Sequence, residues 1–266
     1  MTGSPRDLPV ELVNLAARLA CSAGDLVASG RRSGSLDVGT KSTSVDLVTQ
    51  WDTASERHIV EGLRRFRPDD GLVGEEGARH VGSSGIEWHV DPIDGTTNFA
   101  YGLPGYAVSI GAVDADGPLA GAVYLPATRE LFTAARGRGA YLGSRRLNVS
   151  TPTSLTETLV ATGFSYSAER RMHQGRRVAL MLPHIRDIRR LGAAATDLCH
   201  VAAGRVDAYF EEALNSWDMV AGVLVATEAG AIATDFAGAP VRPAELVVGA
   251  PTIHAELREL INRCSS

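Results

Sequence analysis

Residues 88–99 read Trp-His-Val-Asp-Pro-Ile-Asp-Gly-Thr-Thr-Asn-Phe, the densest run of chemistry-bearing side chains in the chain. Pro92 disfavours a helical conformation at the residue before it, so we expect Asp91 to lie at the end of a strand. Asp94 follows three residues later. The run therefore predicts a strand that delivers two carboxylates to one place.

The residues that follow these carboxylates favour an anion instead. Gly95 has no side chain to keep the backbone away from a ligand, and Thr96 or Thr97 can open a helix whose free N–H groups attract an anion. The segment thus offers carboxylates for a cation beside amides for a phosphate. An ordinary turn before a capped helix would explain residues 91–95 equally well, because each of them favours turns. The nine residues 91–99 form a more specific pattern.

Two further acidic clusters have the same character. Residues 72–77 read Leu-Val-Gly-Glu-Glu-Gly, a short apolar strand that ends in Glu75 and Glu76, and Asp218 lies where a helix begins. Taken alone, the first is as well explained by a solvated acidic turn and the second by a helix N-cap. Their combination with residues 88–99 favours a functional site.

The chain around these motifs alternates between helical and strand patterns. Apolar side chains at helical spacing predict a long first helix over residues 8–27, and a stretch rich in Gly, Ser and Thr over residues 31–44 predicts a mobile loop. Asp52 is expected to cap a second helix that ends before Pro68.

The rest of the chain completes this pattern. Residues 72–142 contain short apolar runs between turns, with strict alternation at 106–112, which predicts an antiparallel meander. The elements expected after residue 151 are a strand at 158–162, a helix from Arg171, a strand at 188–191, a helix at 194–203, a strand at 206–210, a helix from Asp218 and a strand at 231–234. Strands that alternate with helices predict layered α/β packing.

Composition excludes several classes of protein. The chain has 266 residues, of which 44% are hydrophobic and 21% charged, and its formal net charge is −5, so disorder is excluded as the main state and nucleic acid is not expected as the main ligand. The best candidate for a membrane span, residues 219–233, is interrupted by Glu228, so no membrane is expected. We expect no secretory signal, because the first residues lack a basic stretch that leads into an apolar run. Three widely spaced cysteines, Cys21, Cys199 and Cys264, suit reduced thiols and a cytoplasmic location.

These motifs, in this order, resemble the inositol monophosphatase family of magnesium-dependent, lithium-sensitive phosphatases. The resemblance implies a layered αβαβα sandwich of the inositol monophosphatase and fructose-bisphosphatase type. It implies one phosphatase domain over residues 1–266, with an α+β half (1–150) and an α/β half (151–266), and a homodimer. The segments that carry it are 41–52, 74–76, 91–99, 192–194, Glu211, Trp217-Asp218 and 227–230.

By this resemblance the metal ligands, for two or three Mg²⁺ ions, are Glu75, Asp91, Asp94, Asp218 and the backbone carbonyl of Ile93. Physical chemistry agrees, because converging carboxylates repel one another unless cations neutralise them. A set of oxygen ligands without Cys or His also selects Mg²⁺ over Zn²⁺. His89 points away from its neighbours along the strand, so we do not expect it to be a ligand.

The resemblance also implies a mechanism. One Mg²⁺, held by Glu75, Asp91 and the Ile93 carbonyl, lowers the pKa of the water that attacks phosphorus in line, and a second, held by Asp91, Asp94 and Asp218, stabilises the departing alkoxide. The expected catalytic residues are Glu75, Thr96, Asp52 and Lys41.

Lys41 stands out, because the other 25 of the 26 basic residues are arginine. It falls where similar proteins carry a lysine in a mobile loop over the metals. Accident is the alternative, but lysine and arginine are not interchangeable as charges that face a phosphate, which favours a function.

The expected substrate contacts are Asp94, Gly95, Thr96, Ala194, Glu211 and Asp218, with the amides of Gly95 and Thr96 holding phosphate oxygens. A surface charge is an equal alternative for Glu211. Ala193 stands where inositol-directed members usually carry Ser or Thr, whereas Thr97 favours the inositol group over histidinol-phosphate members, which often have Lys there. Inositol monophosphate, a small-molecule phosphate monoester, is thus the expected substrate.

Histidinol phosphate, fructose 1,6-bisphosphate and adenosine 3',5'-bisphosphate remain alternative substrates. An interaction protein of the same fold, which contacts transcription machinery or another partner, is an alternative of a different class. The intact metal-site residues argue against a purely binding role.

Overall fold

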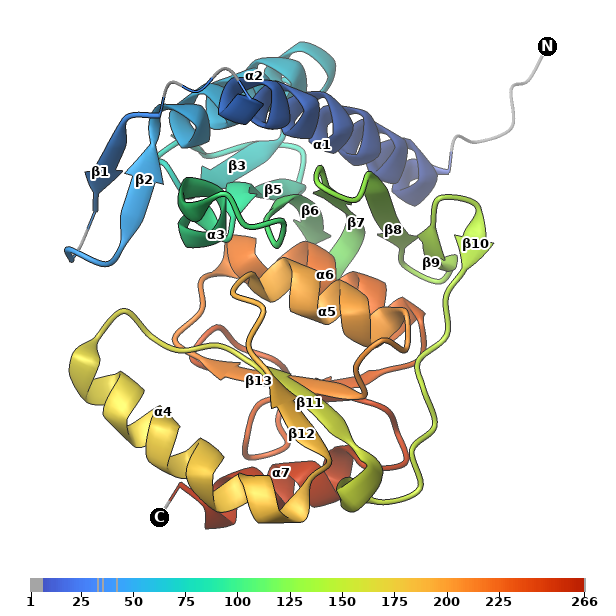
Figure 1. Cartoon of the computed structure of the whole chain (residues 1–266). Coiled ribbons are helices and arrows are strands. Elements are labelled where there is room, and N and C mark those ends of the chain that lie inside the picture. The colour runs from blue at the N-terminus through green and yellow to red at the C-terminus, as the bar shows by residue number, and fades with distance from the viewer. Residues whose placement is uncertain (1–6, 33, 35, 42, 266) are drawn as a thin grey trace.

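Helices pack on both sides of two β-sheets in a layered arrangement (Figure 1). The structure, a computed structural model, describes residues 7–32, 34, 36–41 and 43–265. The helices are α1 (Leu8–Arg32), α2 (Gln50–Phe66), α3 (Thr96–Tyr101), α4 (Ala168–Met181), α5 (Ala194–Ala202), α6 (Ser216–Glu228) and α7 (His254–Arg263), with 3-10 turns at Leu155–Glu157 and Leu182–His184.

The strands form an eight-stranded sheet, a five-stranded sheet and a two-stranded hairpin. The hairpin is β1 (Val38–Thr40) and β2 (Leu47–Thr49). The large sheet has the order β10 (Arg145–Arg146), β9 (Gly139–Leu142), β8 (Glu130–Ala135), β7 (Gly117–Leu125), β6 (Ala107–Asp114), β5 (Glu87–Asp94), β3 (Gly71–Gly74) and β4 (Arg79–His80). The small sheet has the order β12 (Asp187–Arg189), β11 (Leu159–Thr162), β13 (Ala208–Glu212), β15 (Glu245–Gly249) and β14 (Ile232–Thr234).

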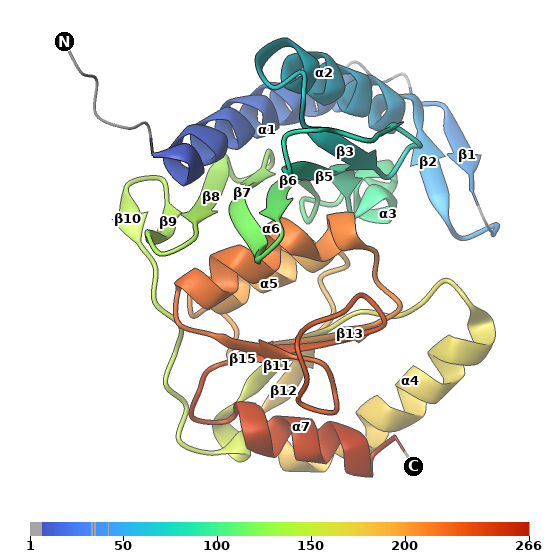
Figure 2. The same cartoon turned by 180° about the vertical axis from the view of Figure 1, so that it is seen from behind.

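The layers run helix, sheet, helix, sheet, helix, which confirms the expected αβαβα sandwich (Figures 1 and 2). Helices α1 and α2 cover one face of the large sheet, and α5 and α6 fill the space between the sheets. Helices α4 and α7 cover the far face of the small sheet. One cluster of buried apolar side chains lies under α1 and α2, a second surrounds α5 and α6 and reaches both sheets, and a third lies between the small sheet and α7. Burial of apolar area therefore stabilises every layer.

The alternation of larger and smaller side chains at residues 106–112 does not mark one buried and one exposed face, because β6 is buried on both faces. Val108 and Ile110 join the cluster under α1 and α2, while Gly111 faces α6. A Cβ at Gly111 would lie 2.5 Å from Val220 Cγ1, so the glycine lets α6 approach the sheet closely. This contact explains Val220 as a packing residue.

Several expected boundaries were wrong. Helix α1 continues to Arg32, and Val38–Thr40 pairs with β2, so residues 31–44 are not one loop. The N-cap of α2 is Thr49, and Asp52 is the third residue of a capping box. Strand β3 pairs antiparallel with β4 but parallel with β5, so the antiparallel meander is continuous only from β5 onward. Helix α4 begins at Ala168, three residues before the expected start.

Helix α1 is the element that meets the length and hydropathy test for a membrane span, rather than residues 219–233, where α6 already ends at Glu228. The test considers length and composition only. The apolar face of α1, which includes Leu12, Leu15 and Leu19, packs into the cluster against the large sheet. Core packing therefore accounts for its hydrophobicity.

Candidate active site

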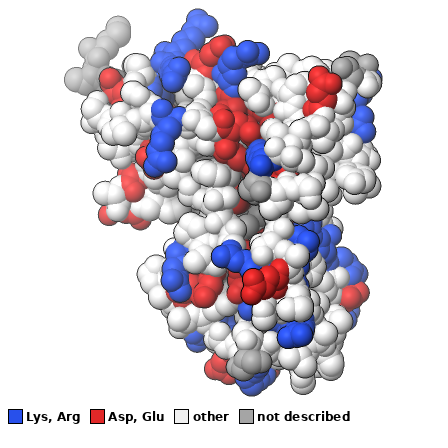
Figure 3. All heavy atoms as spheres, turned by 90° about the vertical axis from the view of Figure 1, so that its left-hand side faces the viewer, with Lys and Arg blue, Asp and Glu red and all other residues white. Residues whose placement is uncertain are grey.

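A cavity of about 360 Å³ opens where the two sheets and their helices meet. Its walls come from β5, the starts of α3, α5 and α6, and residues 163–167 before α4. On the face that Figure 3 shows, acidic atoms gather above the hollow between the upper and lower parts of the molecule. The carboxylates that line the cavity are Glu75, Asp91, Asp94, Asp197, Glu211, Glu212 and Asp218.

The structure brings nearly all the expected site residues together. Ile93, Gly95, Thr96 and Ala194 line this cavity with the expected carboxylates. Asp52 and Lys41 do not line the cavity themselves, but each contacts a residue that does: Asp52 contacts Thr96 and Lys41 contacts Glu75. The interpretation of Glu211 as a surface charge is wrong, because its side chain lines the cavity.

A bulge in β5 explains how Asp91 and Asp94 serve one site. Residues three apart in a regular strand point to opposite faces. Here Asp91 pairs with Ser109 and Asp94 with Ala107, so β5 has one extra residue across Pro92 and Ile93. The extra residue brings Asp94 back to the side of Asp91. The expectation that the strand ends at Asp91 was therefore wrong.

Helix N-termini hold three of the acids. Asp52 is the capping-box acid of α2, and Asp218 holds the same position in α6, where the Asn215 amide donates to its Oδ2 at 2.6 Å. The alternative interpretation of Asp218 as an N-cap is therefore wrong, because the N-cap of α6 is Asn215. Helix α5 lacks a side-chain cap, and Asp94 replaces it by accepting from the amides of Ala194 (3.1 Å) and Ala195 (2.7 Å). These bonds fix each carboxylate at the positive end of a helix.

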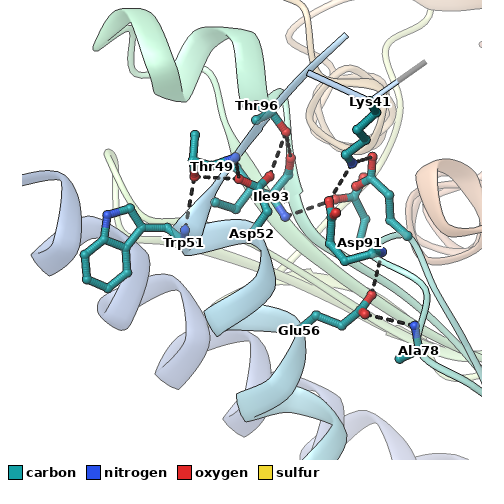
Figure 4. Close-up of polar contacts among 11 residues, drawn as sticks. Lys41, Thr49, Trp51, Asp52, Glu56, Ala78, Asp91, Ile93 and Thr96 are labelled. Carbon is teal, nitrogen blue, oxygen red and sulfur yellow. Dashed lines mark hydrogen bonds and ion pairs between the residues drawn. The ribbon is translucent and has the colours of Figure 1, made fainter. Parts of the chain in front are cut away.

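Thr96 links Asp52 to the bulge (Figure 4). Its Oγ1 lies 2.9 Å from Asp52 Oδ1 and 2.9 Å from the Ile93 carbonyl oxygen. Asp52 is fully buried and also accepts from the amide and hydroxyl of Thr49. Burial raises the pKa of Asp52, and these hydrogen bonds only partly oppose the rise. A carboxylate with a raised pKa beside a hydroxyl is suited to accept a proton.

Two charged side chains, Glu56 and Lys41, contact the turn that carries Glu75. Glu56 of α2 accepts from the amides of Glu76 (2.8 Å) and Ala78 (3.0 Å), and a Cβ at Gly74 would lie 2.2 Å from its carboxylate. Lys41 donates to Oε1 of Glu75 at 2.8 Å and also to Glu76 (Figure 4). Sequence reasoning missed Glu56, whose position four residues after Asp52 on the buried side of α2 was the available signal.

The central carboxylates share an unfavourable environment. The Asp91 carboxyl lies within hydrogen-bond reach of both Glu75 and Asp218. Burial, then repulsion by the other acids, raises the pKa of Asp91 and Asp94 well above their usual value, and burial raises the pKa of Asp218 to about 6. Burial alone would lower the pKa of Lys41, but attraction to and hydrogen bonds with Glu75 and Glu76 together outweigh it and raise that pKa.

The donor chemistry fits a hard cation. The facing groups are carboxylate and carbonyl oxygens, which Mg²⁺ prefers. Glu75 Oε2 is buried without a hydrogen-bond partner, which is costly unless something binds it. No group of three or more Asp, Glu, His or Cys side chains among the described residues is already arranged to hold a metal ion. Lys41, Asn215 and the α5 amides engage these carboxylates instead.

The opposite wall is suited to hydroxyl groups. Glu211 Oε2 accepts from the buried hydroxyl of Tyr209, and burial raises the pKa of Glu211 to about 7. Tyr166, Arg170, Arg190 and Asp197 also line the cavity and were missed, because no local pattern places them there.

Gly163→Ala tests the role of Glu211. A Cβ at Gly163 would lie 1.8 Å from Glu211 Oε2, so the carboxylate must move. We expect KM to rise about tenfold with kcat little changed, because losing a hydrogen bond to a charged group costs about 1.5 kcal/mol. The control is Gly175→Ala in α4, where an added Cβ meets nothing within 4 Å. Wild-type KM in Gly163→Ala would remove Glu211 from the substrate contacts.

The fold and the cavity together define a class of protein, the layered αβαβα phosphatases. Residues 9–265 match the sequence profile of the inositol monophosphatase family. The chain is 42% identical over 260 residues to "Nus factor SuhB" of Pasteurella multocida, covering 96% of this chain and 97% of that protein. It is also 42% identical over 282 residues to "Inositol-1-monophosphatase SuhB" of Mycobacterium tuberculosis (strain ATCC 25618 / H37Rv), covering 97% and 96%.

Solved structures agree with the sequence match. The native crystal structure of the extragenic suppressor protein suhB from Bartonella henselae superposes with a TM-score of 0.90 at 35% identity, covering 95% of this chain and 99% of that one. The chain therefore belongs to the inositol monophosphatase family, as its motifs predicted, and is a phosphatase.

Proposed function

We propose that the protein is a magnesium-dependent phosphomonoesterase that hydrolyses inositol monophosphate to inositol and phosphate. The observation that carries the proposal is the convergence of Glu75, Asp91, Asp94 and Asp218, from three separate segments, on one cavity beside the starts of α5 and α6. A cavity that collects acids at helix N-termini suits a cation and a phosphate together.

In this proposal two Mg²⁺ ions, or three, bind at the cavity. Glu75, Asp91 and the Ile93 carbonyl would hold one, and Asp91, Asp94 and Asp218 would hold another. Bound Mg²⁺ supplies the positive charge that makes water nucleophilic at neutral pH and stabilises charge on the leaving oxygen.

The protein's own groups orient the water and take its proton. With its hydrogen directed to Asp52, the Thr96 hydroxyl leaves a lone pair free to accept from the water that attacks phosphorus. Asp52 can then receive a proton through Thr96, in keeping with its raised pKa.

Substrate recognition divides between two walls. The amides of Gly95 and Thr96 would hold phosphate oxygens. Glycine is needed at position 95 because φ is 87° and a Cβ would lie 2.8 Å from the Gly105 carbonyl oxygen. Glu211 and the Ala194 backbone would contact hydroxyl groups of the ring. The half-buried Glu211, fixed by Tyr209, supports a polyol over an apolar leaving group.

A Lys41→Arg variant tests the cation that covers the Glu75 turn. The compact ammonium donates to two carboxylates, whereas a guanidinium is larger and planar and holds its donors in a fixed fork, so it would meet the same carboxylates in a different geometry. We expect kcat/KM to fall about tenfold, the loss typical when a partner of a metal ligand is changed. Arg145→Lys, on the exposed edge strand β10, is the matched control. Wild-type kinetics for Lys41→Arg would class Lys41 as a surface residue.

The decisive experiment measures kcat/KM of the purified protein with Mg²⁺ against inositol 1-phosphate, histidinol phosphate, fructose 1,6-bisphosphate and adenosine 3',5'-bisphosphate. The proposal expects inositol 1-phosphate to be the best substrate. A higher kcat/KM for another ester would show that this ester, and not inositol 1-phosphate, is the preferred substrate of the protein. Family membership also supports a homodimer, a cytoplasmic location and inhibition by lithium as parts of the proposal.

A regulatory interaction protein on the same fold is the second candidate. The observation that favours it is the 42% identity to the protein titled "Nus factor SuhB". Its test is whether a partner captured by the wild-type protein is captured equally by Asp94→Asn, since a binding role does not need the metal site. Capture that depends on Asp94 would argue against an independent role.

A further inference from the structure

A partly buried hydrogen bond outside the proposed mechanism joins two elements that carry central carboxylates, β5 and α6. His89 of β5 is 8% exposed, and its Nδ1 lies 2.8 Å from Ser216 Oγ in the first turn of α6. On the other side of the ring, Nε2 lies 3.2 Å from the half-exposed carboxylate of Glu87. One neutral tautomer satisfies both contacts, with Nε2–H donating to Glu87 and Nδ1 accepting from Ser216.

Each partner of the hydrogen bond lies two residues before one of the central carboxylates. His89 lies two residues before Asp91, ahead of the bulge, so both side chains point to the same face of the sheet. Ser216 lies two residues before Asp218, and both belong to the first turn of α6. The bond therefore connects the strand that presents Asp91 to the helix turn that presents Asp218.

Other contacts leave this turn less well fixed. The capping box between Asn215 and Asp218 lies within the turn and does not join it to the sheet. Ser109 Oγ contacts the Trp217 carbonyl at a longer 3.4 Å. Val220 rests on Gly111 and sets the height of the helix above the sheet, but apolar contact is not directional. A short hydrogen bond is directional and can fix where the turn sits along β5.

We propose that the hydrogen bond between His89 and Ser216 is a positioning element for the metal site, which sets the separation of Asp91 and Asp218 and so the affinity for the ion they share. The inference rests on the proposed function, because it assumes that these two carboxylates hold one cation. The residues act through the ligands and do not touch substrate.

The experiment titrates metal-free protein with MgCl₂ by calorimetry and measures Tm in EDTA. The variants are Ser216→Ala, the double variant His89→Leu/Ser216→Ala, and His89→Asn, whose side-chain amide can replace Nδ1. Glu87→Gln is the control, because it alters the ring's outer contact and leaves the bond to Ser216 in place. Outer partners of metal ligands typically change affinity 10–100-fold when removed.

We expect Ser216→Ala and the double variant to weaken one of the two Mg²⁺ sites about tenfold and to leave the other site and the Tm in EDTA nearly unchanged. His89→Asn and Glu87→Gln should bind both ions as the wild type does. Unchanged affinity in the double variant would overturn the proposal while leaving the proposed function intact. A second result would also overturn the proposal: both ions bind equally more weakly, the Tm in EDTA falls, and His89→Asn does not restore either. The hydrogen bond would then only stabilise the fold. Wild-type protein that binds no Mg²⁺ would instead refute the proposed function, and this inference with it.

Discussion

Asp94→Asn is expected to lower kcat by about a thousandfold at saturating Mg²⁺, because losing a metal ligand costs roughly 4 kcal/mol of transition-state stabilisation. The fold should survive. An asparagine has nearly the same shape as Asp94, and its carbonyl oxygen can still accept one of the two α5 amides that now bond to the carboxylate. Steady-state kinetics over a range of Mg²⁺ concentrations, with circular dichroism as the check on folding, measures both effects.

The matched control is Asp116→Asn, the same chemical change at an exposed turn between β6 and β7. It should have wild-type kinetics. Wild-type turnover in Asp94→Asn would show that Asp94 serves only as the cap of α5 and would remove it from the metal ligands.

Removing the metal is the second large effect, and it should depend on pH. Chelation should abolish turnover. Without Mg²⁺ the folded protein holds buried carboxyls whose pKa values lie above those of the unfolded chain: the pKa of Asp218 is about 6, that of Glu211 about 7, and those of Asp91 and Asp94 are strongly raised. The folded state therefore binds more protons than the unfolded state above about pH 4, where unfolded carboxyls ionise.

The sign follows from this proton difference. Stability falls with rising pH wherever the folded state binds more protons, so these groups should destabilise the metal-free protein progressively from about pH 4 to above pH 7. Mg²⁺ favours the ionised carboxylates and should reverse the trend. An ion at 100 times its Kd adds about 2.7 kcal/mol to the free energy of unfolding. For a chain of this size that corresponds to a rise in Tm of roughly 5–10 °C.

Scanning calorimetry in EDTA and in excess MgCl₂, at several pH values, measures this effect. Buried histidines act in the opposite direction, since burial lowers the pKa of His200 to about 4. His200 lies outside the cavity lining, so the difference between the two Tm curves isolates the carboxylates. The Tm gain from Mg²⁺ should grow as the pH rises. A gain that is absent, or that shrinks over this range, would refute a cation site among these acids.

Local sequence chemistry predicted the short-range features of the site well. The turn at Gly95 and the helix that starts at Thr96 are as expected, because glycine at positive φ and a threonine at a helix start are local preferences. The bulge at Pro92 was not predicted, since it appears only when β5 is paired with β6. Pairing register is a property of two strands, and one strand's sequence does not state it.

Helix caps show the same division. Asp52 was expected as a cap, and a cap was the alternative interpretation of Asp218, because acids favour helix starts. Each is instead the third residue of a capping box. Asp94 caps α5 from strand β5. It has no local cap signature, because α5 begins 100 residues later in the sequence. A cap supplied from a distant segment depends on how layers stack.

The sequence alone determined the chemistry of this protein: oxygen ligands, turn glycines and helix starts in an order that predicts the family, the layered fold and the acids of the site. The tertiary structure alone decided how those groups meet. Glu56 beneath the Glu75 turn, Gly163 beside Glu211 and the bond between His89 and Ser216 are contacts between segments 20 to 127 residues apart. Local spacing follows from backbone preferences of a few residues, whereas these contacts exist only after apolar burial has stacked the helices on the sheets.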